Sequence, residues 1–461
     1  MLWIVVPLLT GALIAFVPRE RTAAIQAGMV CALLALIALL VPVATALALG
    51  PFSLKIAASV RVLGRSFIFG PADGPILASI YGIAALWFFG AVASSVGRRF
   101  VPLGLSIVAL LVASIAVDPF LFAAPLIMLA AMLAVPMMVL PGTTGVRGTL
   151  RFLIHQTLAV PLILFSGWML AGVEASPGDI ALTSQAGILL ALGFSFLLAI
   201  FPLYSWIPML AEETSPYVLG FVLWALPTFA VVFALGFLDR YAWLRTSPQL
   251  VQAVRLAGLV MLVTGGWFAA FQRHLGRMMA YAAVAETGLA ILALTLGSLR
   301  SAELVFLLFI PRGIELTLWS LALSIFASRT PSLRFRAMQG LARTYPIAAA
   351  GIVLAHLSMS GLPMLAGFPS RFALWQELAR RSIGPAIWVL IGLVSLLFGG
   401  LRSLAVLVMA PAGKPWQSNE NRVQALMLGV AITGLFIVGL FPQTLQVFLR
   451  QLPLMFEHLA E

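Results

Sequence analysis

Two long hydrophobic stretches of this chain are interrupted by proline and glycine. The first break covers residues 200–208 and the second covers residues 360–368. Proline lacks a backbone N–H and glycine frees the backbone, so a membrane helix is expected to break at such points. Paired broken helices in the two halves of a membrane protein indicate a transport pathway near the bilayer midplane. The sequence therefore predicts two discontinuous membrane helices.

The rest of the chain is also dominated by apolar runs. Hydrophobic residues make up 62% of its 461 residues and charged residues only 9%, with a mean hydropathy of +1.10. Soluble proteins carry about a quarter charged residues, whereas a membrane helix needs roughly 20 apolar ones. We therefore predict an all-α polytopic membrane protein. About fourteen segments are expected, near residues 2–17, 23–49, 74–97, 100–117, 119–140, 150–172, 182–208, 215–238, 252–271, 277–298, 302–327, 341–380, 384–411 and 422–447.

The basic residues indicate an orientation in the membrane. The net charge is +12, but the arginines stand singly or in pairs in short joints, which argues against a nucleic-acid-binding face. If the N-terminus lies outside, the inward joints carry Arg19, Arg21, Arg98, Arg99, Arg147, Arg151, Arg273, Arg277, Arg329, Arg334, Arg336, Arg343, Lys414 and Arg422. The outward joints carry fewer, chiefly Lys55, Arg61, Arg65, Arg240, Arg245, Arg300, Arg380 and Arg381. This bias predicts both termini outside the cytoplasm, in a bacterial-type inner membrane.

Three ionisable residues lie deep inside apolar runs of the second half. A charge at the bilayer centre costs roughly 2.5–3.5 kcal/mol on insertion scales, so such residues are functional candidates. Glu286 stands in the middle of one run, and Arg312 and Glu315 stand three residues apart on the next predicted helix. The spacing lets Arg312 and Glu315 form a purely structural pair. Glu286 could equally hydrogen-bond a neighbouring helix.

Four further ionisable residues lie beside the two breaks. His356 and Arg371 flank the second break, and Glu212 and Glu213 follow the first. A buried hydrogen-bonded histidine and a snorkelling arginine are the structural alternatives for the first two. For the two glutamates, a solvated or capping role is the default expectation. Acidic, imidazole and hydroxyl groups together can conduct protons, whereas arginine only biases them because it does not deprotonate.

No catalytic, metal-binding or cofactor-binding site is expected in this chain. Its single cysteine, Cys31, cannot form a disulfide within the chain, and no Cys/His cluster has metal-ligand spacing. There is also no nucleotide-binding loop and no pairing of a nucleophile with a base. Any redox cofactor or quinone site is expected in partner subunits.

Four motifs resemble one family. Residues 201–208 are similar to the F-P-F-H-x-W-L-P signature of antiporter-like membrane subunits, which occur in respiratory complex I, multisubunit cation/proton antiporters and membrane-bound hydrogenases. Residues 272–288 resemble the run Q-x-D-L-K-R-L-L-A-Y-S-S-I-x-H-x-G. Residues 357–372 resemble L-S-x-x-G-x-P-P-x-A-G-F-x-x-K-F, and residues 439–443 resemble the ending G-L-F-P-x.

The resemblance implies a particular architecture. It comprises fourteen helices, two inverted five-helix repeats that each contain a broken helix, and a hydrated chain of lysines, histidines and glutamates at the membrane centre. On this chain it implies N-terminal helices in residues 1–99 and a first repeat in 100–240, with its break near 200–208. A second repeat in 250–411, with its break near 360–368, and a C-terminal helix in 412–461 would follow.

The first repeat departs from the family pattern at its ionisable positions. The expected glutamate of the fifth helix falls at Ile127, and the expected lysines fall at Leu197 and at Leu226 or Pro227. The first half has therefore lost its ionisable centre.

The second repeat keeps charges of changed type. The family lysine of the eleventh helix falls near Glu315, the histidine of the A-Y-S-S-I-x-H run is Glu286, and the lysine of the second break is Arg371. In the leading interpretation Glu286, Glu315 and His356 exchange protons, while Arg312 and Arg371 tune them.

These features predict a non-catalytic, antiporter-like subunit of a multisubunit proton-translocating complex. The complex would be redox-coupled, of the complex I or membrane-bound hydrogenase type, and the proton path of this subunit would be degenerate or re-routed. Two alternatives remain open. The chain could be a purely structural scaffold subunit, or the membrane partner of an ion-antiport or inorganic-carbon uptake system. Other membrane subunits and redox subunits are the expected partners.

Overall fold

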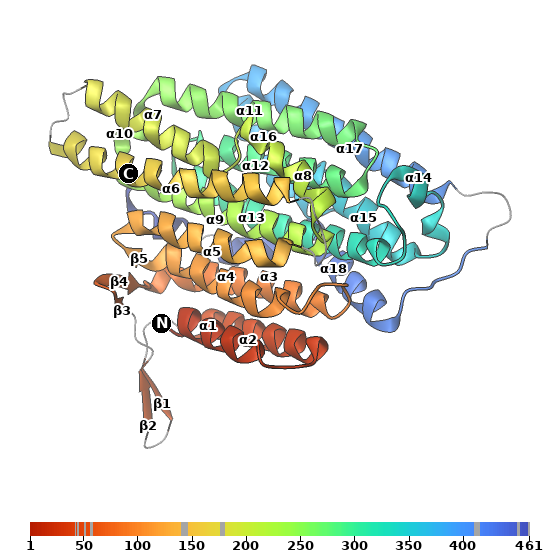
Figure 1. Ribbon diagram of the computed structural model, residues 1–461. Helices are drawn as coiled ribbons and strands as arrows, with labels where there is room; N and C mark the ends of the chain where they lie inside the picture. The colour runs from red at the N-terminus through yellow and green to blue at the C-terminus, as the bar shows by residue number, and fades with distance from the viewer. Residues whose placement is uncertain are drawn as a thin grey trace.

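The computed structural model describes residues 1–41, 43, 46–49, 52–55, 59–139, 146–175, 180–409, 415–449 and 452–459. Long helices lie side by side in one bundle, and both chain ends lie at the same end of it (Figure 1). We call this the termini end. The turn between α1 and α2, the short helix α14 and the start of α18 lie at the opposite end.

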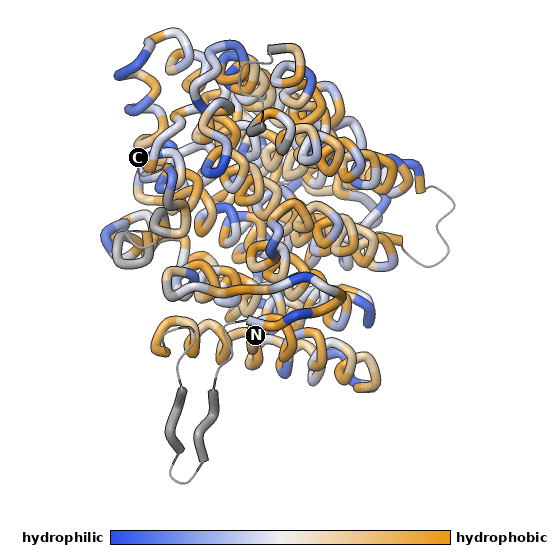
Figure 2. The backbone as a smooth tube through the Cα atoms, turned by 90° about the vertical axis from the view of Figure 1, so that its left-hand side faces the viewer, coloured by the Kyte–Doolittle hydropathy of each residue, from blue (hydrophilic) through white to orange (hydrophobic). Residues whose placement is uncertain are grey.

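Ten helices are long and apolar enough to cross a membrane: α2 (Glu20–Leu40), α3 (Gly74–Ala91), α5 (Ala123–Met138), α6 (Arg147–Ala175), α9 (Pro216–Arg240), α11 (Pro248–Phe271), α12 (Leu275–Leu294), α13 (Leu299–Ala327), α17 (Ile383–Val408) and α18 (Arg422–Leu440). Four apolar helices are shorter: α1 (Leu2–Ile14), α4 (Phe100–Ala116), α7 (Ile180–Leu197) and α15 (Pro346–Met359). In chain order these fourteen correspond to the fourteen predicted segments. Hydrophobic residues colour most of their length in Figure 2.

Five further α-helices lie in the described chain: α8 (Trp206–Glu213), α10 (Ala242–Thr246), α14 (Phe335–Met338), α16 (Gly367–Arg381) and α19 (Gln443–Leu449). Two of them follow the predicted interruptions along the chain, α8 after α7 and α16 after α15. Both predicted breaks are thus confirmed. In the second break Gly361 adopts a φ of +79°, a left-handed conformation that glycine tolerates without strain.

The all-α prediction missed two β-hairpins at the termini end. Helix α2 ends at Leu40, so the prediction of a helix through residue 49 was wrong. Strand β1 (Ala46–Leu49) pairs antiparallel with β2 (Phe52–Lys55), and β3 (Ser59–Val62) pairs with β4 (Arg65–Ile68), which also pairs with β5 (Val117–Asp118). Leu63 and Gly64 both have positive φ, as a two-residue hairpin turn requires.

Three helices form the enclosed centre of the bundle. Of the 18-residue apolar stretch of each helix, 89% of the residues are buried in α9, 83% in α12 and 89% in α13. In α18 the buried share is 28%. The peripheral helices therefore expose apolar side chains to the surroundings, as membrane helices do.

Some predictions fall outside the described residues. These are Lys414 and the predicted boundary between residues 411 and 412, and of Lys55 only the backbone is described. The division into two inverted repeats remains a prediction.

Candidate functional site

Three of the predicted ionisable residues meet at the centre of the bundle. Arg371 of α16 donates through one guanidinium nitrogen, Nη2, to Oε1 of Glu286 on α12 and to Oε2 of Glu315 on α13. The Arg371–Glu315 distance is 3.0 Å, and all three side chains are almost fully buried. Because α16 begins at the break, it places Arg371 in the middle of the bundle. We call these three residues, together with Arg312, the charged centre.

The second break holds this geometry in place. Ser358, near the end of α15, donates to Oε1 of Glu315 at 2.5 Å and accepts from the backbone N–H of Gly367 at 3.0 Å. A Cβ atom on Gly367 would lie 2.1 Å from the Ser358 carbonyl oxygen and 2.1 Å from Arg371 Nη1. Glycine is therefore required where α16 starts.

Arg312 forms no ion pair with Glu315 in the described structure, although their spacing allows one. It donates instead to the Leu223 carbonyl oxygen on α9 at 2.7 Å and to Thr287 Oγ1 on α12 at 3.1 Å. The reason lies four residues after Leu223, where Pro227 has no N–H with which to close the helical hydrogen bond. The free carbonyl attracts the guanidinium of Arg312, and Arg371 takes Glu315.

His356 lies apart from these ion pairs. Its ring stacks on Trp319 with centroids 4.5 Å apart, and it is fully buried. A Cβ atom on Gly399 would lie 3.0 Å from its Cε1 atom, so this glycine makes room for the imidazole. A role for His356 in proton exchange remains a prediction.

The centre of the first half is apolar, as the sequence comparison predicts. Ile127, Leu197 and Leu226 are buried hydrophobic side chains. Leu197, Leu226 and Pro227 line a cavity together with Gln156 and Thr287. Its volume of about 10 Å³ is at the lower limit of the roughly 10–15 Å³ that a single water needs.

Glu286 borders a separate cavity that extends from the charged centre toward the termini end. This cavity, of about 20 Å³, is also lined by Thr228, Val231, Val305 and Arg312. It is large enough for one water next to the carboxylate. Arg371 in turn borders a groove of about 360 Å³ between α16 and α17.

Glu212 and Glu213 have structural roles at the opposite end. The carboxylate of Glu213 accepts from the backbone N–H groups of Gly148 and Thr149 at the start of α6, a favourable position for a negative charge. Glu212 pairs with Arg277 at 3.0 Å. The capping alternative is thus confirmed for Glu213.

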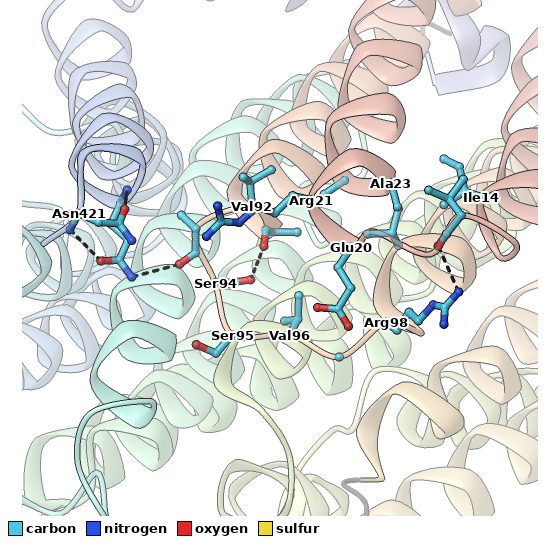
Figure 3. A pocket seen from close by; sticks show the side chains of 17 residues that line it. Ile14, Glu20, Arg21, Ala23, Val92, Ser94, Ser95, Val96, Arg98 and Asn421 are labelled. Carbon is cyan, nitrogen blue, oxygen red and sulfur yellow. Dashed lines mark hydrogen bonds between the residues drawn. The ribbon is translucent and has the colours of Figure 1, made fainter.

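A polar pocket of about 220 Å³, which sequence reasoning missed, opens at the opposite end (Figure 3). It lies between the α1–α2 turn, the α3–α4 turn and the start of α18, and its polar lining comprises Glu20, Arg21, Ser94, Ser95, Arg98, Asn421 and Gln424. Of these residues, sequence reasoning used only Arg21 and Arg98, as signals of orientation. It could not find the pocket, since the convergence of these residues depends on the packing of three distant turns.

One family description covers most of this bundle. The family of NADH:quinone oxidoreductase/Mrp antiporter transmembrane proteins matches residues 123–399. The chain belongs to this family. As an antiporter family member, it is an integral multi-pass membrane protein.

Two curated relatives illustrate the degree of similarity within the antiporter family. NADH-quinone oxidoreductase subunit 14 of Thermus thermophilus is 27% identical over 346 residues, which cover 71% of this chain and 75% of the relative. NADH-quinone oxidoreductase subunit N of Geobacter metallireducens is 29% identical over 273 residues, or 58% of this chain and 57% of the relative.

Chains from three solved membrane complexes share the fold of this chain. A chain of respiratory complex I from Thermus thermophilus gives a TM-score of 0.79 at 20% identity and covers 100% of this chain and 99% of that one. A chain of an archaeal membrane-bound sulfane sulfur reductase gives 0.81 at 14%, covering 100% and 98%. A chain of the Mrp complex from Dietzia sp. gives 0.78 at 18%, covering 98% and 51%.

Proposed function

We propose that this chain is an antiporter-like subunit in the membrane arm of a redox-coupled, proton-translocating complex, with proton exchange confined to its second half. The observation that carries the proposal is the buried arrangement of Glu286, Arg371 and Glu315 beside a cavity large enough for water. The first-half centre has neither an ionisable side chain at Ile127, Leu197 or Leu226 nor comparable room.

The chemistry of the charged centre supports proton exchange at Glu286. Two carboxylates and two guanidinium groups make the centre electrically neutral when all four are ionised. Protonation of Glu286 leaves Arg371 paired with Glu315 and gives the centre one net positive charge, so uptake and release of this proton change the charge of the centre. Arg371 and Arg312 hold their protons and act by position and charge alone.

Membership of a larger complex is supported by the relatives. The curated relatives are named as subunits of NADH-quinone oxidoreductase, and the similar solved chains come from multisubunit membrane complexes. Other membrane subunits, and through them redox subunits, are therefore the proposed partners. The subunit itself would carry out no catalysis and hold no cofactor.

A bacterial-type inner membrane with both termini outside the cytoplasm completes the proposal. Both chain ends lie at the termini end, whereas the α1–α2 and α3–α4 turns, with Arg19, Arg21, Arg98 and Arg99, lie at the opposite end (Figure 1). Arginine-rich short loops face the cytoplasm in most membrane proteins.

The test is proton translocation by the assembled complex in vesicles. Glu286→Gln and Glu315→Gln are each expected to lower the number of protons moved per turnover, because the amide cannot take up a proton. Glu303→Gln, at a half-exposed pair with Arg300 near the termini end, is the matched control and should have no effect.

Unchanged proton translocation in both variants would favour the second candidate, a purely structural scaffold. The apolar centre of the first half is the observation that supports that candidate. Purification without redox subunits, together with cation transport in vesicles, would point instead to an ion-antiport system.

A further inference from the structure

A groove of about 240 Å³ lies between the two halves of the bundle, toward the termini end. Helices α7 and α9 line it from the first half, α11 and α12 line it from the second, and the short helix α10 lies at its termini end (Figure 1). Helix α7 packs along α6, whereas α11 packs along α12 and α17. We call this space the seam groove. Its apolar lining includes Leu190, Phe194, Leu198, Val254, Ala257 and Leu294.

The seam groove has the depth of one leaflet of a bilayer. Its lining follows the chain from Gly187 on α7 to Leu198 at the first break, eleven positions later. Eleven helical residues cover about 16 Å, and half of a hydrocarbon core is about 15 Å thick. The groove is open to the surroundings of the bundle, because Ala191 of α7 and Ala253 of α11 line it and are exposed. It therefore follows the path of a lipid acyl chain in the leaflet at the termini end.

The seam groove is too small for a helix of a neighbouring subunit. A helix is about 10–12 Å across with its side chains, so a helical segment of the same length would occupy on the order of 1,000 Å³. The groove offers about 240 Å³. An extended hydrocarbon chain, which has no side chains, matches this space better.

Arg245 supplies the charged end of the seam groove. It lies on α10 and is the one charged residue in the groove lining. Its Nη1 donates to the Leu238 carbonyl at 3.4 Å, and among the described residues no carboxylate pairs with it. A guanidinium has five N–H donors, so most of them remain for the oxygens of a phosphate. Trp243, on the same short helix, is of a residue type enriched at membrane–water interfaces.

The remaining polar groups of the lining offer no donors to a ligand. Ser195 Oγ donates to the Ala191 carbonyl at 2.6 Å, and Thr295 Oγ1 donates to the Leu292 carbonyl at 2.7 Å. Apart from Arg245, the groove thus presents an apolar surface. An apolar channel with a cation at its outer end is complementary to a long-chain molecule with an anionic head.

The alternative occupant is bulk lipid that exchanges freely, as on the surface of any membrane protein. Phe194, Leu198 and Leu294 are buried, so helices cover a chain in the groove on several sides. Lipid held in this way is expected to leave slowly. Bulk lipid also gives no reason for an arginine without a carboxylate partner at the end of the groove.

We propose that the seam groove holds one acyl chain of an anionic phospholipid from the leaflet at the termini end, and that Arg245 binds the phosphate of this lipid. The inference goes beyond the proposed function and does not depend on proton exchange at the charged centre. The bound chain would fill the space between α7 and α11 and so join the two halves of the bundle.

The first test is retention of a lipid probe. The purified complex is incubated with phosphatidylglycerol that carries a photoreactive diazirine in one acyl chain, exchanged into lipid-free detergent and irradiated. Mass spectrometry of peptides from this chain then locates the adducts. The label on the groove-lining parts of α7 and α11 should exceed that on α1, where Leu13 and Phe16 are exposed, by about tenfold, or ~1.4 kcal/mol. Equal labelling of α1 and the groove, or no retained label, overturns the proposal.

The second test fills the groove. Ala257→Phe places a ring in the space between α7 and α11 and is expected to lower the retained label about tenfold. Leu256→Phe is the matched control, because Leu256 is the preceding residue of α11, is 63% exposed and does not line the groove. Its label should equal that of the wild type. Full labelling of the Ala257→Phe variant shows that the lipid does not occupy the groove.

The third test concerns the phosphate and leaves the packing of the groove unchanged. Arg245→Gln should lower the retained phosphatidylglycerol label about fivefold, which corresponds to about 1 kcal/mol, and Arg245→Lys should restore most of it. Excess unlabelled phosphatidylglycerol should displace the probe, whereas diacylglycerol with the same acyl chains should displace it poorly. Equal displacement by diacylglycerol, or an unchanged label in Arg245→Gln, rules out an anionic phospholipid bound by Arg245.

Discussion

At the scale of single residues, Arg371 organises the charged centre by binding two glutamates through one nitrogen. Sequence reasoning singled out Glu286, Glu315 and Arg371 because a charge inside an apolar run is costly. It could not find which residues pair, because Glu286 and Arg371 are 85 positions apart and only the packing of α16 brings them together. Spacing along one helix favoured Arg312 instead, and Pro227 on another helix decided otherwise.

Gly367 offers a direct test of how tightly this centre is built. Gly367→Ala is expected to destabilise the protein by about 1–3 kcal/mol, because its Cβ would collide with the Ser358 carbonyl and with Arg371. The measurement is the midpoint of thermal unfolding in detergent. Gly429→Ala is the matched control, since a Cβ there meets no atom within 4 Å. Equal midpoints for the two variants would contradict the crowded geometry.

At the scale of helices, the two breaks and the fourteen apolar segments were predictable because their signals are local. A run of about twenty apolar residues predicts a membrane helix, and proline or glycine within such a run predicts a break, without any knowledge of tertiary contacts. The hairpins β1–β2 and β3–β4 were missed because residues 46–49 are as apolar as a helix end. The hydrogen bond from Arg312 of α13 to the Leu223 carbonyl of α9 also depends on tertiary contact and has no local signal.

Pro227 and Arg312 are expected to be energetically coupled across these two helices. Arg312→Leu leaves the Leu223 carbonyl without a donor in the wild-type background. In a Pro227→Ala background the new N–H at position 227 satisfies that carbonyl. The cost of Arg312→Leu should therefore be smaller there by about 1–3 kcal/mol, measured by a double-mutant cycle of unfolding free energies. Pro161→Ala, within α6, is the control background and should give additive effects.

Asp73, at the start of α3, predicts a pH dependence of stability. Its carboxylate accepts from the Gly70 N–H at 2.7 Å, and burial raises its pKa from 3.8 to about 6. The folded state therefore keeps this proton to a higher pH than the unfolded state does. The stabilising contribution is full below pH 3.8 and is lost as the pH rises through about 6.

The thermal unfolding midpoint should accordingly fall between pH 4 and pH 7 because of this group. Asp73→Asn should flatten that part of the profile, since the amide does not titrate. An Asn variant with the same slope as the wild type would show that Asp73 is not responsible.

At the scale of the whole molecule, the two halves share helices of similar kind but differ at their centres. The first half is packed with Ile127, Leu197 and Leu226, and the second half holds the charged centre. The family resemblance predicted this asymmetry, because it specified which positions should be ionisable. It did not predict the polar pocket, which lies where the α1–α2 turn, the α3–α4 turn and the start of α18 converge.

The orientation of the whole molecule can be tested at its ends. Peptide tags at the N-terminus and at the C-terminus should both be cleaved by a protease added to spheroplasts, because both ends lie at the termini end (Figure 1). A cysteine introduced by Arg336→Cys in α14 should react only from the cytoplasmic face. Protection of either tag in spheroplasts, with cleavage in inverted vesicles, would reverse the proposed orientation.

The Pro227–Arg312 arrangement also limits how this chain could change over evolutionary time. A lysine at position 227 would supply an N–H that competes with Arg312 for the Leu223 carbonyl. It would also add a second cation to the cavity that Arg312 lines. Both effects are unfavourable while Arg312 is present, so a lysine at position 227 requires Arg312 to be replaced first or simultaneously. A single substitution therefore does not readily place a lysine in the first half at this position.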